Sequence, residues 1–246
     1  MAAAVTESPP ASPNFRPPDR SLFAAGRFVY QKNCQVCHGR FGEGDGELVR
    51  EWEVLPRNFA QARFKYRSTP SGKLPTDADL ERTIRRGISG SAMPIFKHLR
   101  DEEVRAVIEY LKSFSNSWRD PANHAEPVPL SKRPGWFADE IERPNQVAAG
   151  RELFANLCAS CHGSGGAGDG PSALTLVDVD ERPIKPANLR QPLRSGPDPE
   201  DVYRTIMTGI TGTPMLGFAG ALSDEQVWQL AVYVISLQGS SDRQED

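Results

Sequence analysis

The four cysteines of the chain form two C-x-x-C pairs, and a histidine follows each pair directly. This is the spacing at which c-type haem is attached: both thiols add to haem vinyl groups as thioethers. The adjacent imidazole then lies below the iron as its proximal ligand. We therefore expect two covalently bound haem c groups with their iron. The residues are Cys34, Cys37 and His38 in the first motif and Cys158, Cys161 and His162 in the second.

The two motifs belong to an internal repeat. Gly44-Asp45-Gly46 follows the first motif at the interval at which Gly168-Asp169-Gly170 follows the second. Other matches lie 122 to 124 residues apart, but Pro56-Arg57-Asn58 and Pro186-Ala187-Asn188 lie 130 apart. The second copy therefore has a longer loop before its Pro-x-Asn segment and a shorter loop after it.

Met93 and Met215 occupy equivalent positions in the repeat, each in a glycine-rich loop beside a proline. A haem that carries electrons needs a second strong axial ligand, and a thioether opposite imidazole raises its potential. We expect Met93 and Met215 to be these distal ligands. Met207 is expected to fill the core and His98 to lie on the surface, whereas His124 has no counterpart in the second copy and is assigned no role.

The repeat divides the chain into domains. The two copies span 21–118 and 147–240, and the intervening 119–146 contains five prolines, which favour an extended, semi-rigid linker. Residues 1–20 are expected to form a flexible proline-rich lead, and 241–246 a frayed tail.

The apolar residues recur at helical spacing and show no strand alternation, which predicts an all-α fold. A helix is expected before each cysteine motif, with Asn145 as the cap of the second one. Short helices are expected at 79–86 and 198–208. The last helix of the second copy should begin at a capping box formed by Ser223 and Gln226.

These features resemble the small His/Met cytochromes c, here in tandem. The resemblance covers about three quarters of the chain. It implies that the first and last helices of each domain cross closely, at Gly26 beside Tyr110 and at Gly150 beside Tyr233. The family more commonly has Pro-Asn-Leu, so the extra residue in Pro-x-Asn leaves open which carbonyl accepts the Nδ1–H of the proximal histidine.

The same residue types also occur in other kinds of site. The two cysteine pairs could form one zinc site, or each could be a redox dithiol. Zinc would leave the repeated His and Met unexplained, and thioredoxin chemistry requires a βαβ setting. The glycine run 163–170 could bind phosphate, but a loop around a haem edge explains it better.

Charge differs between the two copies. The whole chain has 29 Lys and Arg against 32 Asp and Glu, which argues against a nucleic-acid partner. Residues 21–118 carry a net +4 (16 against 12) and residues 147–240 a net −4 (6 against 10). This asymmetry could orient charged partners or attract the two domains to each other. The candidate docking residues are Arg63, Lys65, Arg67 and Lys73.

Together these features predict a dihaem cytochrome c that relays single electrons between a redox donor and an acceptor, and that is not itself an enzyme. A dihaem peroxidase or a thiosulfate-oxidising cytochrome is the alternative, and would need one iron with an exchangeable ligand. A subunit docked on a larger oxidoreductase or oxidase complex is compatible with electron transfer.

The sequence also bears on location. No segment approaches the ~18 apolar residues that span a bilayer, and the N-terminus has neither the basic nor the apolar region of an export signal. Because haem c is attached outside the bacterial cytoplasm, we expect a periplasmic protein whose signal or anchor has been removed or replaced. A membrane tether, or a place in a membrane complex, is compatible with this.

Overall fold

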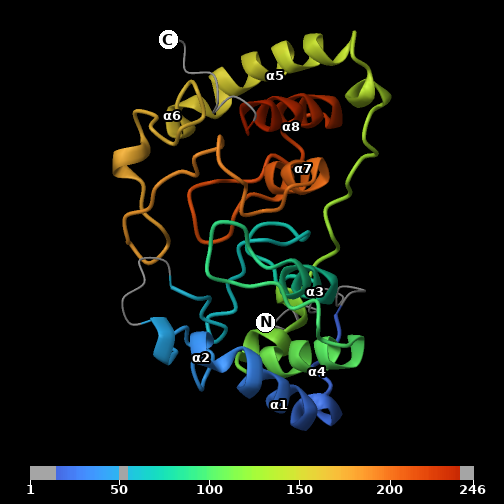
Figure 1. Ribbon diagram of the computed structural model, residues 1–246, viewed down its shortest axis with the longest axis vertical. Coiled ribbons are helices and arrows are strands. Elements are labelled where there is room, and N and C mark those ends of the chain that lie inside the picture. The colour runs from blue at the N-terminus through green and yellow to red at the C-terminus, as the bar shows by residue number, and fades with distance from the viewer. Residues whose placement is uncertain (1–14, 50–54, 239–246) are drawn as a thin grey trace, which may run out of the picture.

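The computed structural model describes residues 15–49 and 55–238. Two helical domains are stacked along the long axis, and an extended linker runs along one side (Figure 1). In the described segments the only β pairing is an isolated bridge between Val177 and Pro183, so the all-α expectation is confirmed. The helices of the first domain are α1 (Phe23–Asn33), α2 (Gln35–His38), α3 (Asp77–Arg86) and α4 (Asp101–Lys112). Those of the second are α5 (Arg143–Leu157), α6 (Ala159–His162), α7 (Pro199–Thr208) and α8 (Asp224–Gln238).

Short 3₁₀ turns connect these helices. They are Arg20–Leu22, Glu47–Val49, Asn116–Arg119, Pro121–Asn123, Gly135–Ala138 and Ala173–Thr175.

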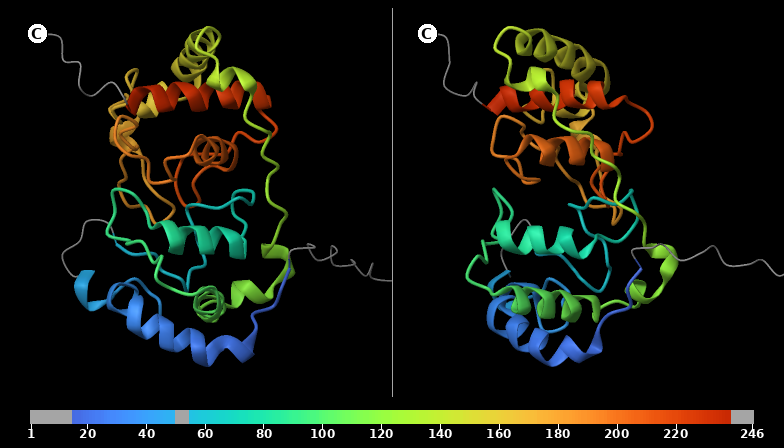
Figure 2. Two further views of the ribbon diagram at one scale, coloured as in Figure 1. Left: turned by 45° about the vertical axis from the view of Figure 1, so that its right-hand side comes forward. Right: turned by 90° about the vertical axis from the view of Figure 1, so that its right-hand side faces the viewer.

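The first and last helices of each domain cross at a glycine. A β-carbon on Gly26 would overlap the backbone of Ala106 and would touch the Tyr110 side chain. Gly150 meets Gln229 and Tyr233 in the same way, so the predicted crossings are confirmed. The crossed pairs α1–α4 and α5–α8 lie at the two ends of the molecule, and α3 and α7 lie in the middle (Figure 2).

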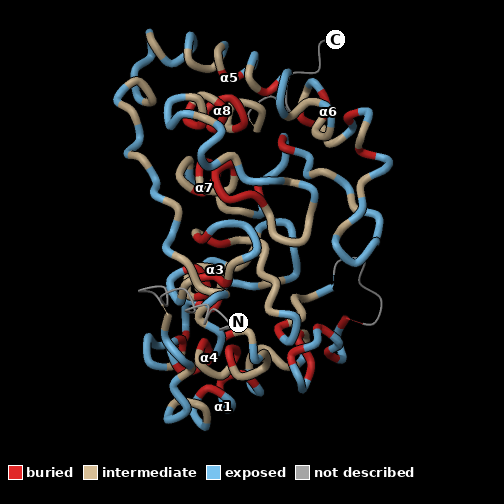
Figure 3. Tube along the Cα trace, turned by 180° about the vertical axis from the view of Figure 1, so that it is seen from behind, coloured by how far each residue is buried: buried red, intermediate tan, exposed pale blue. Residues whose placement is uncertain are grey.

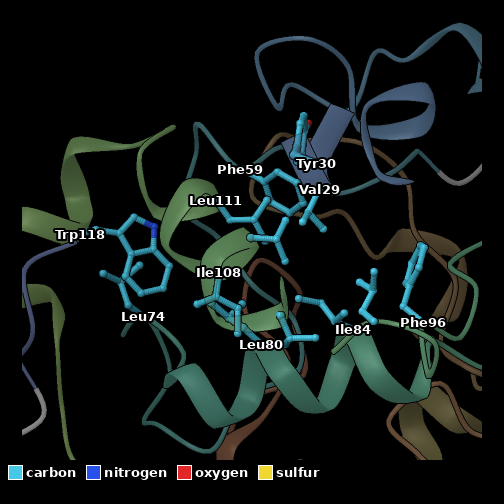
Figure 4. Close-up of a cluster of buried hydrophobic side chains, with 13 residues drawn as sticks. Val29, Tyr30, Phe59, Leu74, Leu80, Ile84, Phe96, Ile108, Leu111 and Trp118 are labelled. Carbon is cyan, nitrogen blue, oxygen red and sulfur yellow. The ribbon is translucent and has the colours of Figure 1, made fainter. Parts of the chain in front are cut away.

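Each domain has its own apolar core. In the first, Leu80 and Ile84 on α3 face Val29, Phe59 and neighbouring side chains (Figure 4). In the second, buried stretches gather on α7 and α8 (Figure 3). Met207 is part of this second core at 7% exposure, as expected.

Helix ends follow local capping chemistry. The Ser223 backbone N–H donates to Gln226 Oε1 at 3.0 Å, and the Gln226 N–H donates to Ser223 Oγ at 3.3 Å, so the capping box before α8 is confirmed. The expectation that Asn145 caps the helix before the second cysteine motif is wrong. α5 begins at Arg143, because Pro144 is favourable in a first helical turn.

The starts of the middle helices differ slightly from the prediction. Thr76 caps α3 and forms a reciprocal box with Asp79, so α3 begins at Asp77, two residues before the predicted start. α7 begins at Pro199, one residue after the predicted start, and the Asp198 side chain makes no capping hydrogen bond.

The linker packs against both domains. The Val128 N–H donates to the Ser68 carbonyl of the first domain at 2.7 Å, and Val128, Trp136 and Phe137 pack against the second core. His124 in the linker contacts the Phe15 ring at 5.0 Å between centroids. Most of the lead and all of the tail 241–246 lie outside the described residues.

Candidate functional site

Each cysteine motif forms one tight turn at the end of a long helix. Cys34 follows α1 directly, and its carbonyl accepts the N–H of Cys37 at 3.1 Å and that of His38 at 2.8 Å. Cys158 accepts from Cys161 at 3.2 Å and from His162 at 2.9 Å after α5. The two sites therefore have the same backbone, and in each one the cysteines and the histidine come from a single turn.

The cysteines are free thiols. Burial, together with the neighbouring cysteine, raises the pKa of Cys34 to about 12 and that of Cys158 to about 11. Such thiols stay protonated at neutral pH, and protonated thiols are neither nucleophiles nor metal ligands. This disfavours Cys34 and Cys158 as the attacking thiols of a redox dithiol.

A shared zinc site is also disfavoured by position. One cysteine pair lies at α2 in the first domain and the other at α6 in the second (Figure 1). Over residues 15–49 and 55–238, no group of three or more His, Cys, Asp or Glu side chains is arranged to hold a metal ion. Each pair also lies in an all-helical domain, without the βαβ setting of a thioredoxin-like dithiol.

Both histidines are oriented by a backbone carbonyl. His38 Nδ1 lies 3.1 Å from the Arg57 oxygen, and His162 Nδ1 lies 3.1 Å from the Ala187 oxygen. A carbonyl can only accept, so the proton is on Nδ1 and the Nε2 lone pair remains for a metal. Burial lowers the pKa of both histidines, which favours this neutral form. The question left open by the sequence is answered: the accepting carbonyl belongs to the extra residue within each Pro-x-Asn segment.

The glycine-rich loop after each motif is bound to the motif itself. The N–H groups of Gly44 and Gly168 donate to the carbonyls of His38 and His162, at 3.0 and 2.8 Å. Further along, the Leu189 N–H donates to a carbonyl within the second loop, on Gly166, at 2.7 Å. The two glycine N–H groups are therefore already used and are not directed at a phosphate. The loops instead join the histidine turn to the Pro-x-Asn segment.

The surroundings of the two histidines differ. The Phe59 ring stacks on the His38 ring, with centroids 4.5 Å apart, and the matching residue of the second domain is Leu189. The Tyr30 hydroxyl donates to the Gly39 carbonyl at 2.7 Å, whereas the equivalent ring, Phe154, has no hydroxyl. The first site is therefore more aromatic and more tightly hydrogen-bonded than the second.

The two candidate methionines lie in loops of the same construction, directly after the middle helices α3 and α7. Both are half-buried. The Met93 carbonyl accepts from the Ile88 N–H at 3.2 Å, and the Met215 carbonyl accepts from the Ile210 N–H at 3.0 Å. In each loop the methionine N–H donates to a hydroxyl two residues earlier, at 3.2 Å. His98 is exposed, as expected.

The expectation that Arg63 and Arg67 dock partners is wrong, because both are used between the domains. Arg63 Nη2 binds the Asp180 carboxylate at 2.7 and 2.9 Å, and Arg67 is 1% exposed. Lys73 is exposed and donates to the Ala122 carbonyl at 2.7 Å. The charge asymmetry therefore holds the two domains together, which was the alternative interpretation.

The inserted loop of the second copy takes part in this contact. Asp180, which binds Arg63, lies in it. The neighbouring Val179 N–H anchors the loop to its own domain by donating to the Gly212 carbonyl at 3.2 Å. The 130-residue offset in the repeat thus corresponds to a loop that reaches the first domain. Neither the sequence pattern nor the charge count showed which residues it would contact.

A second group of cations crosses the same interface, namely Arg57 and Lys65 of the first domain and Arg194 of the second. Burial lowers the pKa of Lys65, and the charges of Arg57 and Arg194 lower it further, against the opposing charge of Asp178. We call Arg57, Lys65 and Arg194 the interdomain cation cluster. Of the three, only Lys65 was expected to have a role through its charge, because Arg57 and Arg194 lie in different copies of the repeat.

The residues present fit haem c. Each domain offers two free thiols on one turn, an imidazole with its free nitrogen fixed, and a thioether in a separate loop. Large apolar side chains are exposed along the segments that flank these groups, as surfaces that an apolar ring can cover. They include Val36, Phe41, Leu48, Leu55 and Ile95 in the first domain, and Leu157, Leu174, Val177 and Leu216 in the second.

Two helical domains, each built around a Cys-x-x-Cys-His turn of the same geometry, define a dihaem c-type cytochrome. The comparison with family models is more specific. Residues 21–111 and 145–234 each match the family described as cytochrome c oxidase, cbb3-type, subunit III. The chain belongs to this family.

Individual relatives agree with the family. The chain is 26% identical over 220 residues to the cbb3-type cytochrome c oxidase subunit CcoP of Azospirillum sp. (strain B510), covering 88% of this chain and 62% of that protein. It is 24% identical over 214 residues to a thiosulfate dehydrogenase of Psychrobacter arcticus, covering 84% of this chain and 56% of that protein. The chain thus spans about three fifths of the length of these curated relatives.

A solved structure is more similar. A chain of the reducing HAO-like protein complex of Kuenenia stuttgartiensis is 42% identical, with a TM-score of 0.76, covering 87% of this chain and 95% of that one. No helix within the described segments is long and apolar enough to cross a membrane.

Proposed function

We propose that this electron-transfer cytochrome relays single electrons between a redox donor and an acceptor through two haem c groups. The observation that carries the proposal is the repeated contact of the proximal histidine Nδ1 with a backbone carbonyl, at 3.1 Å in both domains. This contact holds each imidazole in one tautomer and one orientation. When bound, haem c supplies reversible one-electron chemistry at its iron.

Met93 and Met215 are the proposed distal ligands. They are equivalent in the repeat and lie in loops with the same hydrogen bonds, each hinged at the end of a middle helix. His38 with Met93, and His162 with Met215, would close each iron to exchangeable ligands. Closed ligation limits rearrangement when an electron arrives, which suits a carrier.

The interdomain cation cluster is proposed to hold the haem propionates. Asp178 and Asp180 lie near these three cations, and Asp180 is already bound to Arg63. Half-buried cations require counter-charges, and propionate carboxylates supply them. In this role Arg57 both orients His38 through its carbonyl and pairs with a propionate through its guanidinium.

The proposed setting is a periplasmic redox complex, which can be attached to a membrane through a tether or through partner subunits. The matched chain from the HAO-like complex and the CcoP relative both belong to larger oxidoreductase assemblies by their names. Native size of the haem-loaded protein, isolated with its partners, tests this part. Recovery of the haem-loaded protein as a monomer from the cytosol would contradict it.

The main experiment is a redox titration of the haem-loaded protein with optical spectra. We expect two one-electron centres that are low-spin in both oxidation states. A high-spin haem would contradict the closed ligation.

The second candidate function is thiosulfate oxidation, which the Psychrobacter arcticus relative favours. It requires one iron with an exchangeable ligand. Turnover of thiosulfate by the haem-loaded protein would favour this function over the carrier. No turnover, together with two low-spin haems, would favour the carrier.

A further inference from the structure

Arg67 belongs to the first domain, but its side chain ends in the second. It is 1% exposed. Its Nη2 donates to the Thr208 carbonyl at 3.0 Å and its Nη1 donates to the Gly209 carbonyl at 3.4 Å. Its Nε donates to the Pro70 carbonyl of its own domain at 3.1 Å, which fixes the guanidinium from the other side.

The two carbonyls that Arg67 binds are at the C-terminal end of α7. Helix-terminal carbonyls lack intrahelical partners and carry the negative end of the helix dipole. A buried guanidinium donates charge-assisted hydrogen bonds to these carbonyls and places a positive charge at the negative end of the dipole. Arg67 is therefore a helix cap supplied by another domain.

The loop that carries Met215 begins at this cap. Gly209 has a φ of 67°, and a β-carbon on it would lie 2.6 Å from the Met215 carbonyl oxygen, so the start of the loop packs on its end. The neighbouring Ile210 N–H donates to that same carbonyl at 3.0 Å. Any shift of Gly209 is thus passed directly to the backbone of Met215.

The corresponding helix of the first domain, α3, has no cap supplied by a side chain of the other domain. The residues equivalent to Thr208 and Gly209 are Arg86 and Gly87. In the part of the chain that the structure describes, no side chain donates to their carbonyls. The Arg86 side chain itself crosses to the second domain, where it binds Asp198 at 2.8 Å and Asp201 at 3.1 Å.

We propose that Arg67 is a positioning residue for the second haem: anchored in the first domain, it holds the Thr208–Gly209 end of α7 and so holds the loop that presents Met215. The two haem sites are then unequal. The backbone carbonyls before the Met215 loop are bound by a side chain of the other domain, whereas those before the Met93 loop are bound by no side chain among the described residues. This inference rests on the proposed ligation by Met215.

The test compares Arg67→Lys and Arg67→Met with the wild type in the full haem-loaded chain. Lysine keeps the charge but has one donor group in place of the fork, so it separates geometry from electrostatics. The control is Asp198→Asn, which removes one of the two carboxylates that bind Arg86 across the interface, near the opposite end of the same helix. Proton NMR of the ferrous state reports the axial-methionine methyl of each haem, and Met93→Ala and Met215→Ala assign the two signals.

With either Arg67 variant we expect the Met215 methyl signal to shift or weaken while the Met93 signal is unchanged. We also expect imidazole to bind the ferric second haem about tenfold to hundredfold faster, as loss of a charge-assisted hydrogen bond allows. Asp198→Asn should change neither. Unchanged signals and rates in both Arg67 variants would overturn the inference, and so would equal effects in Asp198→Asn.

Failure of the proposed ligation looks different. If Met215→Ala leaves both methyl signals in place, Met215 is not a ligand, and the proposed function is contradicted whatever Arg67 does. If Met215→Ala removes one signal and the Arg67 variants leave both signals and the imidazole-binding rates unchanged, the ligation stands and only the positioning role of Arg67 is wrong.

Discussion

Gly26 lies against the backbone carbonyl of Ala106, so closely that no side chain fits between α1 and α4. Gly150 lies against Gln229 in the second domain in the same way. Cys34 follows α1 directly, so this contact also places the first cysteine motif relative to the last helix. The crossing therefore connects the core to the site.

Gly26→Ala should destabilise the first domain. In an exposed helix this substitution stabilises by about 1 kcal/mol, but here the added carbon meets backbone, and we expect a loss of about 1–3 kcal/mol. Denaturant unfolding of the haem-loaded protein measures it. Gly135→Ala is the control, because a β-carbon there meets nothing within 4 Å. A Gly26→Ala protein as stable as the wild type would contradict the close crossing.

Met93→Ala and Met215→Ala should each remove about half of the sulfur-to-iron charge-transfer band of the ferric protein. Loss of the thioether should also lower the potential of the affected haem by a sizeable part of the ~0.8 V that axial ligands span. Spectroelectrochemistry measures both. Met207→Ala is the control for losing a methionine, since Met207 lies in the core. A full band in either ligand variant would show that its iron has another distal ligand.

Cys158→Ser combined with Cys161→Ser should leave one covalent haem per chain, because the second motif then has no sulfur to attach it. Pyridine haemochrome absorbance per mole of protein measures the count. The matched variant, Cys34→Ser with Cys37→Ser, should give the same count but leave the other haem. Two covalent haems in either variant would show that its cysteines are not the attachment site.

Lys65→Met should lower the midpoint potential of at least one haem. A cation near the iron disfavours the ferric state, so removing it makes reduction harder. One charge at about 10 Å with an effective dielectric near 20 corresponds to about 70 mV. Lys132→Met in the exposed linker makes the same change in net charge and should leave both potentials unchanged. Equal shifts in the two variants would argue against the cluster as the propionate site.

Asp79→Asn should destabilise the first domain at neutral pH. Asp79 is 1% exposed. Its carboxylate accepts from Ser68 Oγ at 2.8 Å, the Thr76 N–H at 3.0 Å and Arg82 at 2.7 Å. Burial alone would raise the pKa of Asp79, but these hydrogen bonds outweigh it and lower the pKa below its usual value. Removing one partner of such a buried pair costs about 3 kcal/mol.

The pH dependence of this effect has a definite sign. A carboxyl whose folded-state pKa is depressed stabilises the fold above its ordinary pKa, and this stability is lost as pH falls through the folded value. The difference between wild type and Asp79→Asn should therefore be constant near pH 7 and shrink below about pH 4. Asp101→Asn, at a side chain 91% exposed, is the control. A difference that grows on acidification would contradict the assignment.

Much of the fold could be predicted from the sequence, because its determinants are local. The cysteine motifs, the repeat and the apolar spacing predicted two helical cytochrome c domains, and the Ser223–Gln226 box predicted the start of α8. Asn145 was predicted as a cap from its residue type alone. The helix instead begins at Arg143, because Pro144 is favourable in a first helical turn.

The sequence by itself determined which residues can do chemistry here, because thioether attachment and imidazole ligation depend on spacings of a few residues. Tertiary structure decided which carbonyl orients each histidine and which domain each cationic side chain contacts. Those contacts join residues far apart in the chain, such as Arg67 and Thr208, and depend on how the domains pack. Composition showed that the two halves carry opposite net charge. Only the packing of the domains brought these charges together at the interface and placed Arg67 against the start of the loop that carries Met215.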